Sequence, residues 1–197
     1  MSEKELEERV LIDKSQFLEI EKYIQENFPN AKVIHQKNRY LDDNNLTLRK
    51  AKNVLRIRSF IQSKNRELTY KLKGDEGDIE HNQIISHYWY YQITTKSRLP
   101  EGIVKQELIK DGIDINSLKV LVTLYTRRME VEFDDHTLVL DTNLYNNIVD
   151  YNIEVESKIS KSHATEVILK YCKQFSLEYK KGYITKSNRA FLSVFKD

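Results

Sequence analysis

The stretch 54–58 reads VLRIR, and the stretch 68–73 reads LTYKLK. Both stretches carry basic residues on alternate positions, with apolar residues between them. Because successive side chains of a β-strand point to opposite faces, this period of two predicts two strands whose charges lie on one face. The polar segment 63–65 between them predicts a hairpin connection.

Two acidic stretches at opposite ends of the chain show the same alternation. Residues 5–9 read ELEER and residues 153–156 read IEVE, so each stretch places two glutamates on one strand face. Like charges on neighbouring positions repel each other, so a ligand is expected to offset this cost. Divalent cations such as magnesium prefer carboxylate oxygens, and arginine and lysine bind phosphate oxygens. The acidic and basic strands together predict a site for a polyanion and a divalent metal.

The composition is typical of a single globular domain, predicted over residues 1–197. Of these residues 40% are hydrophobic and 31% charged, and the net charge is only +2. This near balance, without a basic aromatic surface stripe, disfavours nucleic-acid binding. A single cysteine, Cys172, excludes an intramolecular disulfide. The sequence has no apolar run near the roughly 20 residues of a membrane span and no signal-peptide pattern, so we expect a cytoplasmic protein that does not bind membranes.

The pattern along the chain predicts an α+β fold. Asp13 and Gln16 resemble a capping box, and apolar residues recur at helical spacing over 15–27 and 162–174. Strands are predicted at 3–12, 32–36 continuing to 39–43, 53–62, 66–74, 79–86, 121–134, 136–142 and 149–157. Short helices are expected within 87–121, and residues 185–189 are expected in a last strand or short helix. About eight strands with short turns favour an antiparallel sheet or barrel.

The ordered set of motifs resembles the CYTH superfamily, also called triphosphate tunnel metalloenzymes. The family's N-terminal Glu-x-Glu-x-Lys is matched by Glu5-x-Glu7-x-Arg9, in which Arg9 keeps the charge but changes the geometry. The resemblance continues in order through 40–42 (YLD), 54–58 (VLRIR), 68–74 (LTYKLKG), Glu80, 126–128 (TRR), 138–141 (LVLD), 150–156 (DYNIEVE) and Lys186-x-x-Arg189.

The match at 126–128 offers two arginines for one basic position. We prefer Arg128 to Arg127, because Arg128 shares a strand face with Glu130 and Glu132. The whole set spans about residues 3–191 and is most similar to the small single-domain members of the family from Gram-positive bacteria.

The resemblance implies a closed antiparallel barrel of about eight strands that forms a tunnel, with helices packed outside. Charged side chains would then point into the tunnel, and apolar side chains would point out toward helices 15–27 and 162–174. Family members hydrolyse triphosphates such as inorganic tripolyphosphate, thiamine triphosphate or nucleoside triphosphates, and they need a divalent metal. We therefore expect a metal-dependent triphosphatase whose partner is a triphosphate-containing small molecule.

The predicted site has an acidic and a basic part. The catalytic residues that would hold one or two Mg²⁺ or Mn²⁺ ions are Glu5, Glu7, Glu154 and Glu156, with Asp141 as an additional metal ligand. The predicted substrate-binding residues are Arg9, Arg56, Arg58, Lys71, Lys73, Arg128, Lys186 and Arg189. No covalent nucleophile is required, because a metal can orient or acidify an attacking water.

Two other functions remain open at this point. A class IV-type adenylate cyclase has the same fold, but the sequence does not identify an adenine pocket. A non-catalytic module that binds polyphosphate or a nucleotide is disfavoured, because anion binding does not need four metal-binding carboxylates. The sequence is compatible with a monomer or a homodimer.

Overall fold

The computed structural model describes residues 2–61, 63–74, 77–180 and 184–195. Within these ranges nine strands form one antiparallel sheet in the order β1-β6-β5-β4-β3-β7-β8-β9-β2, which is nearly closed into a barrel. The strands are β1 (Ser2–Glu5), β2 (Glu7–Ile12), β3 (Lys32–Asp42), β4 (Val54–Phe60), β5 (Arg66–Leu72), β6 (Asp78–Ile85), β7 (Lys119–Glu132), β8 (His136–Tyr145) and β9 (Ile148–Ser157). The predicted α+β barrel is confirmed; Gln62, at the end of predicted strand 53–62, lies outside the described residues.

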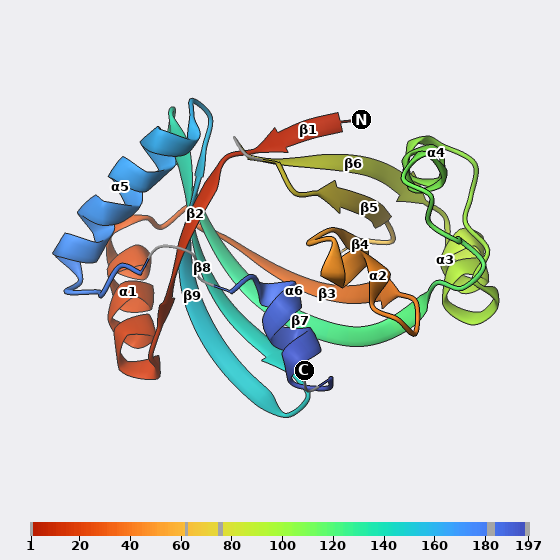
Figure 1. Cartoon of the computed structure of the whole chain (residues 1–197). Helices are drawn as coiled ribbons and strands as arrows, with labels where there is room; N and C mark the ends of the chain where they lie inside the picture. The colour runs from red at the N-terminus through yellow and green to blue at the C-terminus, as the bar shows by residue number, and fades with distance from the viewer. Residues whose placement is uncertain (1, 62, 75–76, 181–183, 196–197) are drawn as a thin grey trace.

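The two ends of the sheet are consecutive in the chain. β1 pairs with β6 and β2 pairs with β9, so one N-terminal segment spans the opening between the two halves of the sheet (Figure 1). The segment changes partner at Leu6, which belongs to neither strand and whose carbonyl oxygen accepts a hydrogen bond of 2.8 Å from Ser157 N–H. The predicted single strand 3–12 is therefore two strands, and this division raises the strand count from eight to nine.

The helices of the described chain are α1 (Lys14–Asn27), α2 (Thr47–Lys50), α3 (His87–Lys96), α4 (Ile103–Lys110), α5 (Lys161–Gln174) and α6 (Lys186–Leu192). The predicted capping box is present, because Asp13 accepts from Gln16 N–H and the Gln16 side chain accepts from Asp13 N–H. The predicted short helices of segment 87–121 are α3 and α4. Residues 186–189 lie in a helix, which decides between the two expected alternatives for this segment.

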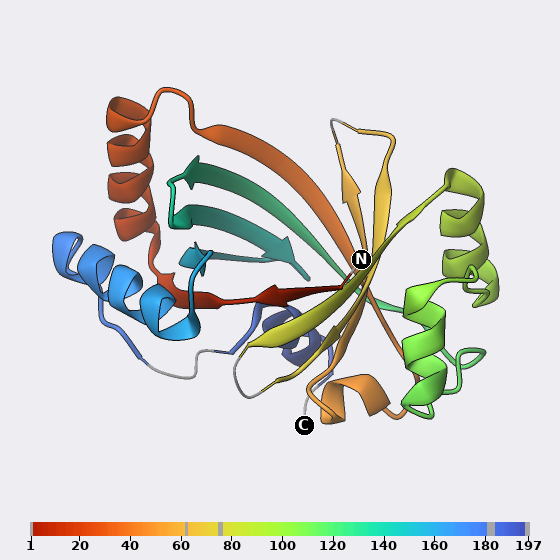
Figure 2. The ribbon, with the colours of Figure 1, turned by 90° about the horizontal axis from the view of Figure 1, so that it is seen from above.

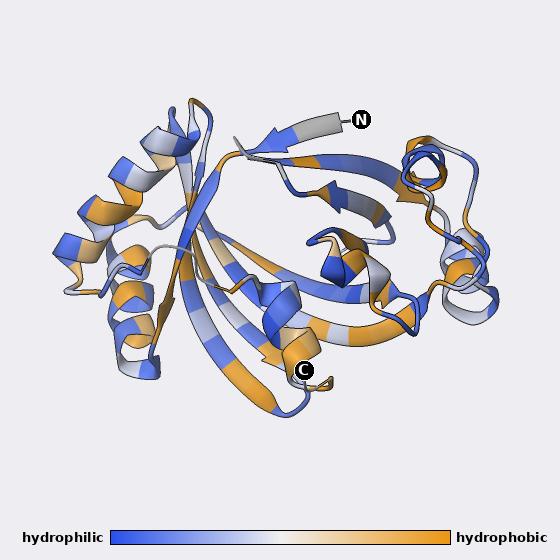
Figure 3. Ribbon diagram, viewed as in Figure 1, coloured by the Kyte–Doolittle hydropathy of each residue, from blue (hydrophilic) through white to orange (hydrophobic). Residues whose placement is uncertain are grey.

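Apolar cores lie outside the barrel, between sheet and helices. α1 and α5 cover one half of the sheet, where Ile20 and Ile24 pack on strand residues such as Val155. α3 and α4 cover the other half, around Leu68 and Tyr70 (Figure 2). Each fully buried aliphatic side chain contributes roughly 1.5–3 kcal/mol. Figure 3 shows the corresponding alternation of hydrophobic and hydrophilic residues along the strands.

Helix α6 packs on strand residues of the face opposite to these cores. Its Phe191 joins Tyr40, Leu124 and Tyr145 in a third apolar cluster. This contact anchors the helix whose first residue, Lys186, reaches the charged interior described below. None of the described helices combines the length and the apolar character needed to cross a membrane.

Candidate active site in the barrel lumen

The barrel encloses a cavity of about 730 Å³ lined by charged side chains. Among the described lining residues, nine are cationic and eight are carboxylates, so their charges nearly balance. The cations are Arg9, Arg49, Lys52, Arg56, Arg58, Lys71, Lys73, Arg128 and Lys186; the carboxylates are Glu5, Glu7, Glu67, Asp78, Glu80, Glu130, Glu154 and Glu156. The predicted inward orientation of the charges on β2, β4, β5 and β9 agrees with this lining.

Three of the five predicted metal carboxylates converge. Glu7, Glu154 and Glu156 each offer an oxygen, and these oxygens lie within 4.8 Å of one another. The sheet register explains their proximity, because Glu7 is the Cα partner of Glu156, and Arg9, two residues on, is the partner of Glu154. The N-terminal and the C-terminal acidic stretch are therefore neighbours on one inner face.

The convergent carboxylates fit a divalent cation. Glu154 is fully buried, and its Oε1 has no hydrogen-bond partner among the described residues, although Arg9 lies 3.5 Å away. Burial raises the pKa of Glu154, but Lys186, Arg9 and Arg128 outweigh burial and hold the pKa well below its usual range. A buried, ionised oxygen without a donor is costly unless a ligand completes its environment. Three carboxylates offer the oxygen ligands that magnesium and manganese prefer.

Glu5, another predicted metal residue, lies beside a cation instead of in this trio. Its carboxylate is bonded to the Lys71 ammonium, which also lies 3.5 Å from Glu7 and 3.2 Å from Asp78. Burial raises the pKa of Glu5, but Lys71 and Arg56 outweigh it and bring the pKa to about 2. Glu5 is thus ionised at neutral pH and anchors Lys71 in the lumen.

Arg128 connects the acidic trio to the strands behind it. Its guanidinium lies 3.0 Å from Glu154 and 2.9 Å from Glu156, and it donates two hydrogen bonds to Asp141. The choice of Arg128 over Arg127 agrees with the structure, since Arg127 pairs instead with Glu21 of α1 on the outside of the barrel, at 2.7 Å.

Arg58 is a partly buried lumen cation with only a long carboxylate contact. Its Nη1 lies 4.0 Å from Glu67, and its Nε donates to the Asn38 side chain at 3.2 Å. Burial and the nearby guanidinium groups of Arg56 and Arg128 lower the pKa of Arg58 to about 10. Its remaining donors are suited to an anion, because arginine binds phosphate with two parallel hydrogen bonds.

Two predicted site residues lie behind the lining rather than in it. Asp141 is 0% exposed and is bonded to Arg128 and Lys186. Arg189 forms two hydrogen bonds with Asp150, of 2.7 and 2.9 Å. Lys73 lines the cavity but is 56% exposed and pairs with Asp78 at 2.9 Å. The metal role of Asp141 and the substrate role of Arg189 stay predictions.

Sequence reasoning did not assign several charged lining residues to the site. Glu80 is buried and lies 3.1 Å from Arg56; burial raises its pKa although Arg56 opposes this. Glu130 also lines the lumen and lies 3.7 Å from Arg128. Glu130 shares strand parity with the assigned Arg128, and this signal was sufficient to find it. Glu80 was included in the family resemblance but was not assigned a role in the site.

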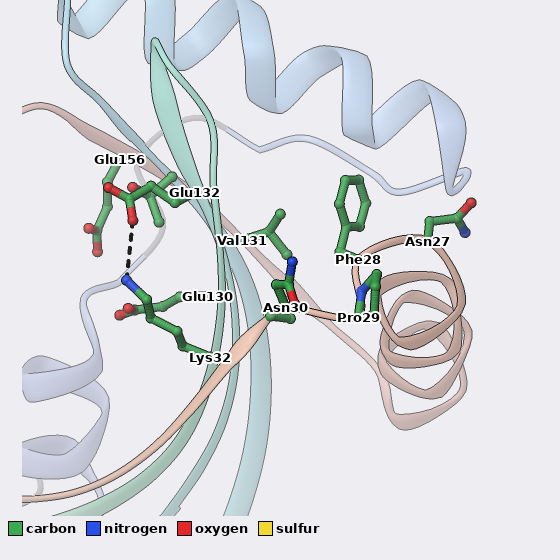
Figure 4. A pocket seen from close by; sticks show the side chains of 11 residues that line it. Asn27, Phe28, Pro29, Asn30, Lys32, Glu130, Val131, Glu132 and Glu156 are labelled. Carbon is green, nitrogen blue, oxygen red and sulfur yellow. Dashed lines mark hydrogen bonds and ion pairs between the residues drawn. The ribbon is translucent and has the colours of Figure 1, made fainter.

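A second hollow adjoins the lumen at the start of β3. It shares Glu130 and Glu156 with the main cavity. Figure 4 shows these two carboxylates near the ion pair of Lys32 and Glu132, whose N and O atoms lie 3.2 Å apart. The acidic part of the lumen therefore continues to an open side of the barrel.

The model of the CYTH domain matches residues 3–182 of the chain. The chain belongs to the CYTH family. A relative from Bacillus subtilis (strain 168), named "Putative triphosphatase YjbK", is 31% identical over 153 residues, which are 78% of this chain and 77% of the relative.

Solved CYTH-like structures share the fold over almost the whole chain. A "putative adenylate cyclase" from Bacillus halodurans has a TM-score of 0.86 and 29% identity and covers 96% of this chain and 98% of its own. A Hippeastrum protein, described as a "putative adenylyl cyclase" with a dominant triphosphatase activity, has a TM-score of 0.75 and 19% identity and covers 95% and 93%. The family membership agrees with the resemblance on which the sequence-based site was built.

Proposed function

We propose that this CYTH protein hydrolyses a triphosphate with the help of a divalent metal bound in the barrel lumen. The observation that carries the proposal is the convergence of Glu7, Glu154 and Glu156 in a cavity that also contains the weakly compensated Arg58. The names of the Bacillus subtilis relative and of the Hippeastrum structure support a triphosphatase.

The charge of the lining supports joint binding of a triphosphate and a cation. Nine cationic and eight acidic side chains among the described lining residues leave little excess positive charge. Most lumen cations are already paired with carboxylates, as Arg56 is with Glu80 and Lys186 with Glu154. A triphosphate is therefore better accommodated together with a divalent cation, as in other phosphoryl-transfer sites.

Different side chains of the lumen would bind the metal and the phosphate groups. Glu7, Glu154 and Glu156 would hold Mg²⁺ or Mn²⁺, which supplies Lewis-acid activation of phosphate oxygens and of the attacking water. Arg58 would donate hydrogen bonds to phosphate oxygens and neutralise charge that develops in the transition state. Arg9 lies between Glu7 and Glu154 and limits the repulsion between these carboxylates.

The decisive experiment is phosphate release from inorganic tripolyphosphate, ATP and thiamine triphosphate, each with magnesium, manganese or a chelator. We expect metal-dependent release that is lost in Glu7→Gln and in Glu156→Gln. A matched control is Glu19→Gln, which removes an exposed carboxylate on α1 and should retain wild-type activity.

Other outcomes would contradict the proposal. Cyclic AMP and pyrophosphate from ATP would identify a cyclase, the activity in the name of the Bacillus halodurans structure. Tight tripolyphosphate binding without release would identify a binding module.

A further inference from the structure

A hydrogen-bonded network lies outside the barrel, behind the proposed metal carboxylates. His163, in the first turn of α5, lies with Nδ1 2.9 Å from Ser157 Oγ and with Nε2 3.1 Å from Asp135 Oδ2. His136 Nδ1 lies 2.7 Å from the other oxygen of Asp135, and His136 Nε2 lies 3.3 Å from Tyr171 OH. The Asp135 carboxylate thus contacts two imidazoles, that of His136 in β8 and that of His163 in α5.

The surrounding donors and acceptors determine which atom of each hydrogen bond in this network carries the proton. Ser157 Oγ accepts from the backbone N–H groups of Ile159 and Ser160, at 3.0 and 3.2 Å. The Ser157 hydroxyl proton is therefore directed to His163 Nδ1, which acts as an acceptor. His163 then carries its proton on Nε2 and donates it to Asp135, a tautomer assigned from the hydrogen-bond partners.

Ser157 links this network to the metal carboxylates. It follows Glu156 directly in β9, and its backbone N–H donates to the carbonyl oxygen of Leu6 at 2.8 Å. Leu6 precedes Glu7, and Glu7 is the strand partner of Glu156. Ser157 therefore holds together two chain segments that each contribute a carboxylate to the trio.

We propose that His163 is a positioning residue for the metal site, which acts through Ser157 on the placement of Glu7 and Glu156. This inference rests on the proposed metal-dependent function. Residues beyond the direct ligands orient the ligands of a metal, and their substitution typically weakens metal affinity by about 10–100-fold. The same turn of α5 adds a second restraint, since the Lys161 ammonium donates to the backbone carbonyl of Glu7.

Two substitutions separate the two contacts of the imidazole. In His163→Asn the side-chain oxygen can replace Nδ1 as acceptor from Ser157, while the contact with Asp135 is lost. In His163→Gln the longer amide can reach Asp135, while the acceptor for Ser157 is lost. A matched control is His87→Gln, an exposed histidine on α3.

The test measures Mn²⁺ binding to the full-length protein by electron paramagnetic resonance, without substrate, at a temperature where circular dichroism shows every variant folded. Thermal midpoints are recorded in parallel. We expect about tenfold weaker Mn²⁺ binding in His163→Gln, affinity close to wild type in His163→Asn, and no change in His87→Gln.

Three results would overturn the inference. Wild-type Mn²⁺ affinity in His163→Gln would exclude a positioning role of His163. If Glu7→Gln abolishes Mn²⁺ binding in the same experiment, the proposed function is left intact. Equal losses of Mn²⁺ affinity in both His163 variants, in proportion to the decrease of their thermal midpoints, would show a purely structural role. Mn²⁺ binding that survives Glu7→Gln would overturn the proposed metal site and this inference together.

Discussion

Arg128 donates two hydrogen bonds of 3.0 Å, one to each carboxylate oxygen of Asp141, across strands β7 and β8. The Lys186 ammonium is also bonded to this carboxylate. Burial raises the pKa of Asp141, but Arg128 and Lys186 outweigh burial and lower it. Asp141 thus lies between two cations behind the proposed metal carboxylates.

Asp141→Asn should destabilise the protein strongly, because Arg128 and Lys186 would lose one of the two carboxylates that they share and would keep only Glu154 between them. Removing one partner of a buried ion pair typically costs about 3–5 kcal/mol. Urea unfolding measures the loss. Glu132→Gln is the matched control: the Glu132–Lys32 pair is 63% and 66% exposed, and such a pair contributes at most about 1 kcal/mol. Equal stability of the two variants would refute the structural role of Asp141.

Arg58→Gln should have opposite effects on stability and on substrate binding. The substitution removes a partly buried cation whose carboxylate contact is 4.0 Å long, so the midpoint of urea unfolding of the free protein should rise. The loss of phosphate contacts should reduce transition-state stabilisation by about 2–4 kcal/mol, measured as kcat/KM for tripolyphosphate. A fall in both quantities would instead indicate that Arg58 stabilises the fold.

The pKa of Glu5 predicts part of the acid sensitivity. Its pKa falls from the ordinary 4.5 to about 2 in the folded protein, so its stabilising contribution is complete above pH 4.5 and is lost as the pH falls toward 2. Glu5→Gln should therefore lose less stability over this interval than wild type. Denaturant unfolding at a series of pH values measures how the free energy of unfolding of each protein depends on pH. Parallel curves for wild type and Glu5→Gln would count against the ionised Glu5–Lys71 pair.

Gly77→Ala should disturb Glu5 through the backbone. A Cβ at Gly77, whose φ is +128°, would lie 2.7 Å from the backbone oxygen of Glu5. We expect a loss of about 1–3 kcal/mol together with reduced tripolyphosphate hydrolysis. Gly112→Ala is the control: its φ is +72°, but a Cβ there has no neighbour within 4 Å. Gly112→Ala should lower the free energy of unfolding by about 1 kcal/mol and leave hydrolysis unchanged.

Strand alternation was sufficient to predict which face of each strand is charged. It selected Arg128 instead of Arg127 and placed Glu7, Glu154 and Glu156 on inner faces, in agreement with the lining of the lumen. A period of two reports the face of a residue but not its partner strand. The division at Leu6 was therefore not predicted, because Glu5, Glu7 and Arg9 continue one uninterrupted alternation.

Side-chain pairing inside the lumen was equally invisible in the sequence. The position of Glu5 beside Lys71 depends on contacts between strands far apart in the chain. Arg128 and Asp141 lie opposite each other on the consecutive strands β7 and β8, but strand alternation alone does not show that their side chains pair. The helical state of residues 186–189 was also undecided, because so short a segment is stabilised by tertiary contacts such as those of Phe191 with Tyr40.

The division of the first strand has a consequence for the order of folding. Glu7 pairs with Glu156, 149 positions later in the chain, so β2 can pair only after β9, the last of the described strands in chain order, is in place. Contacts of such high sequence separation form slowly. The pairing of β2 with β9 thus also assembles the carboxylate trio, and we expect that metal binding at the proposed site would report that folding is complete.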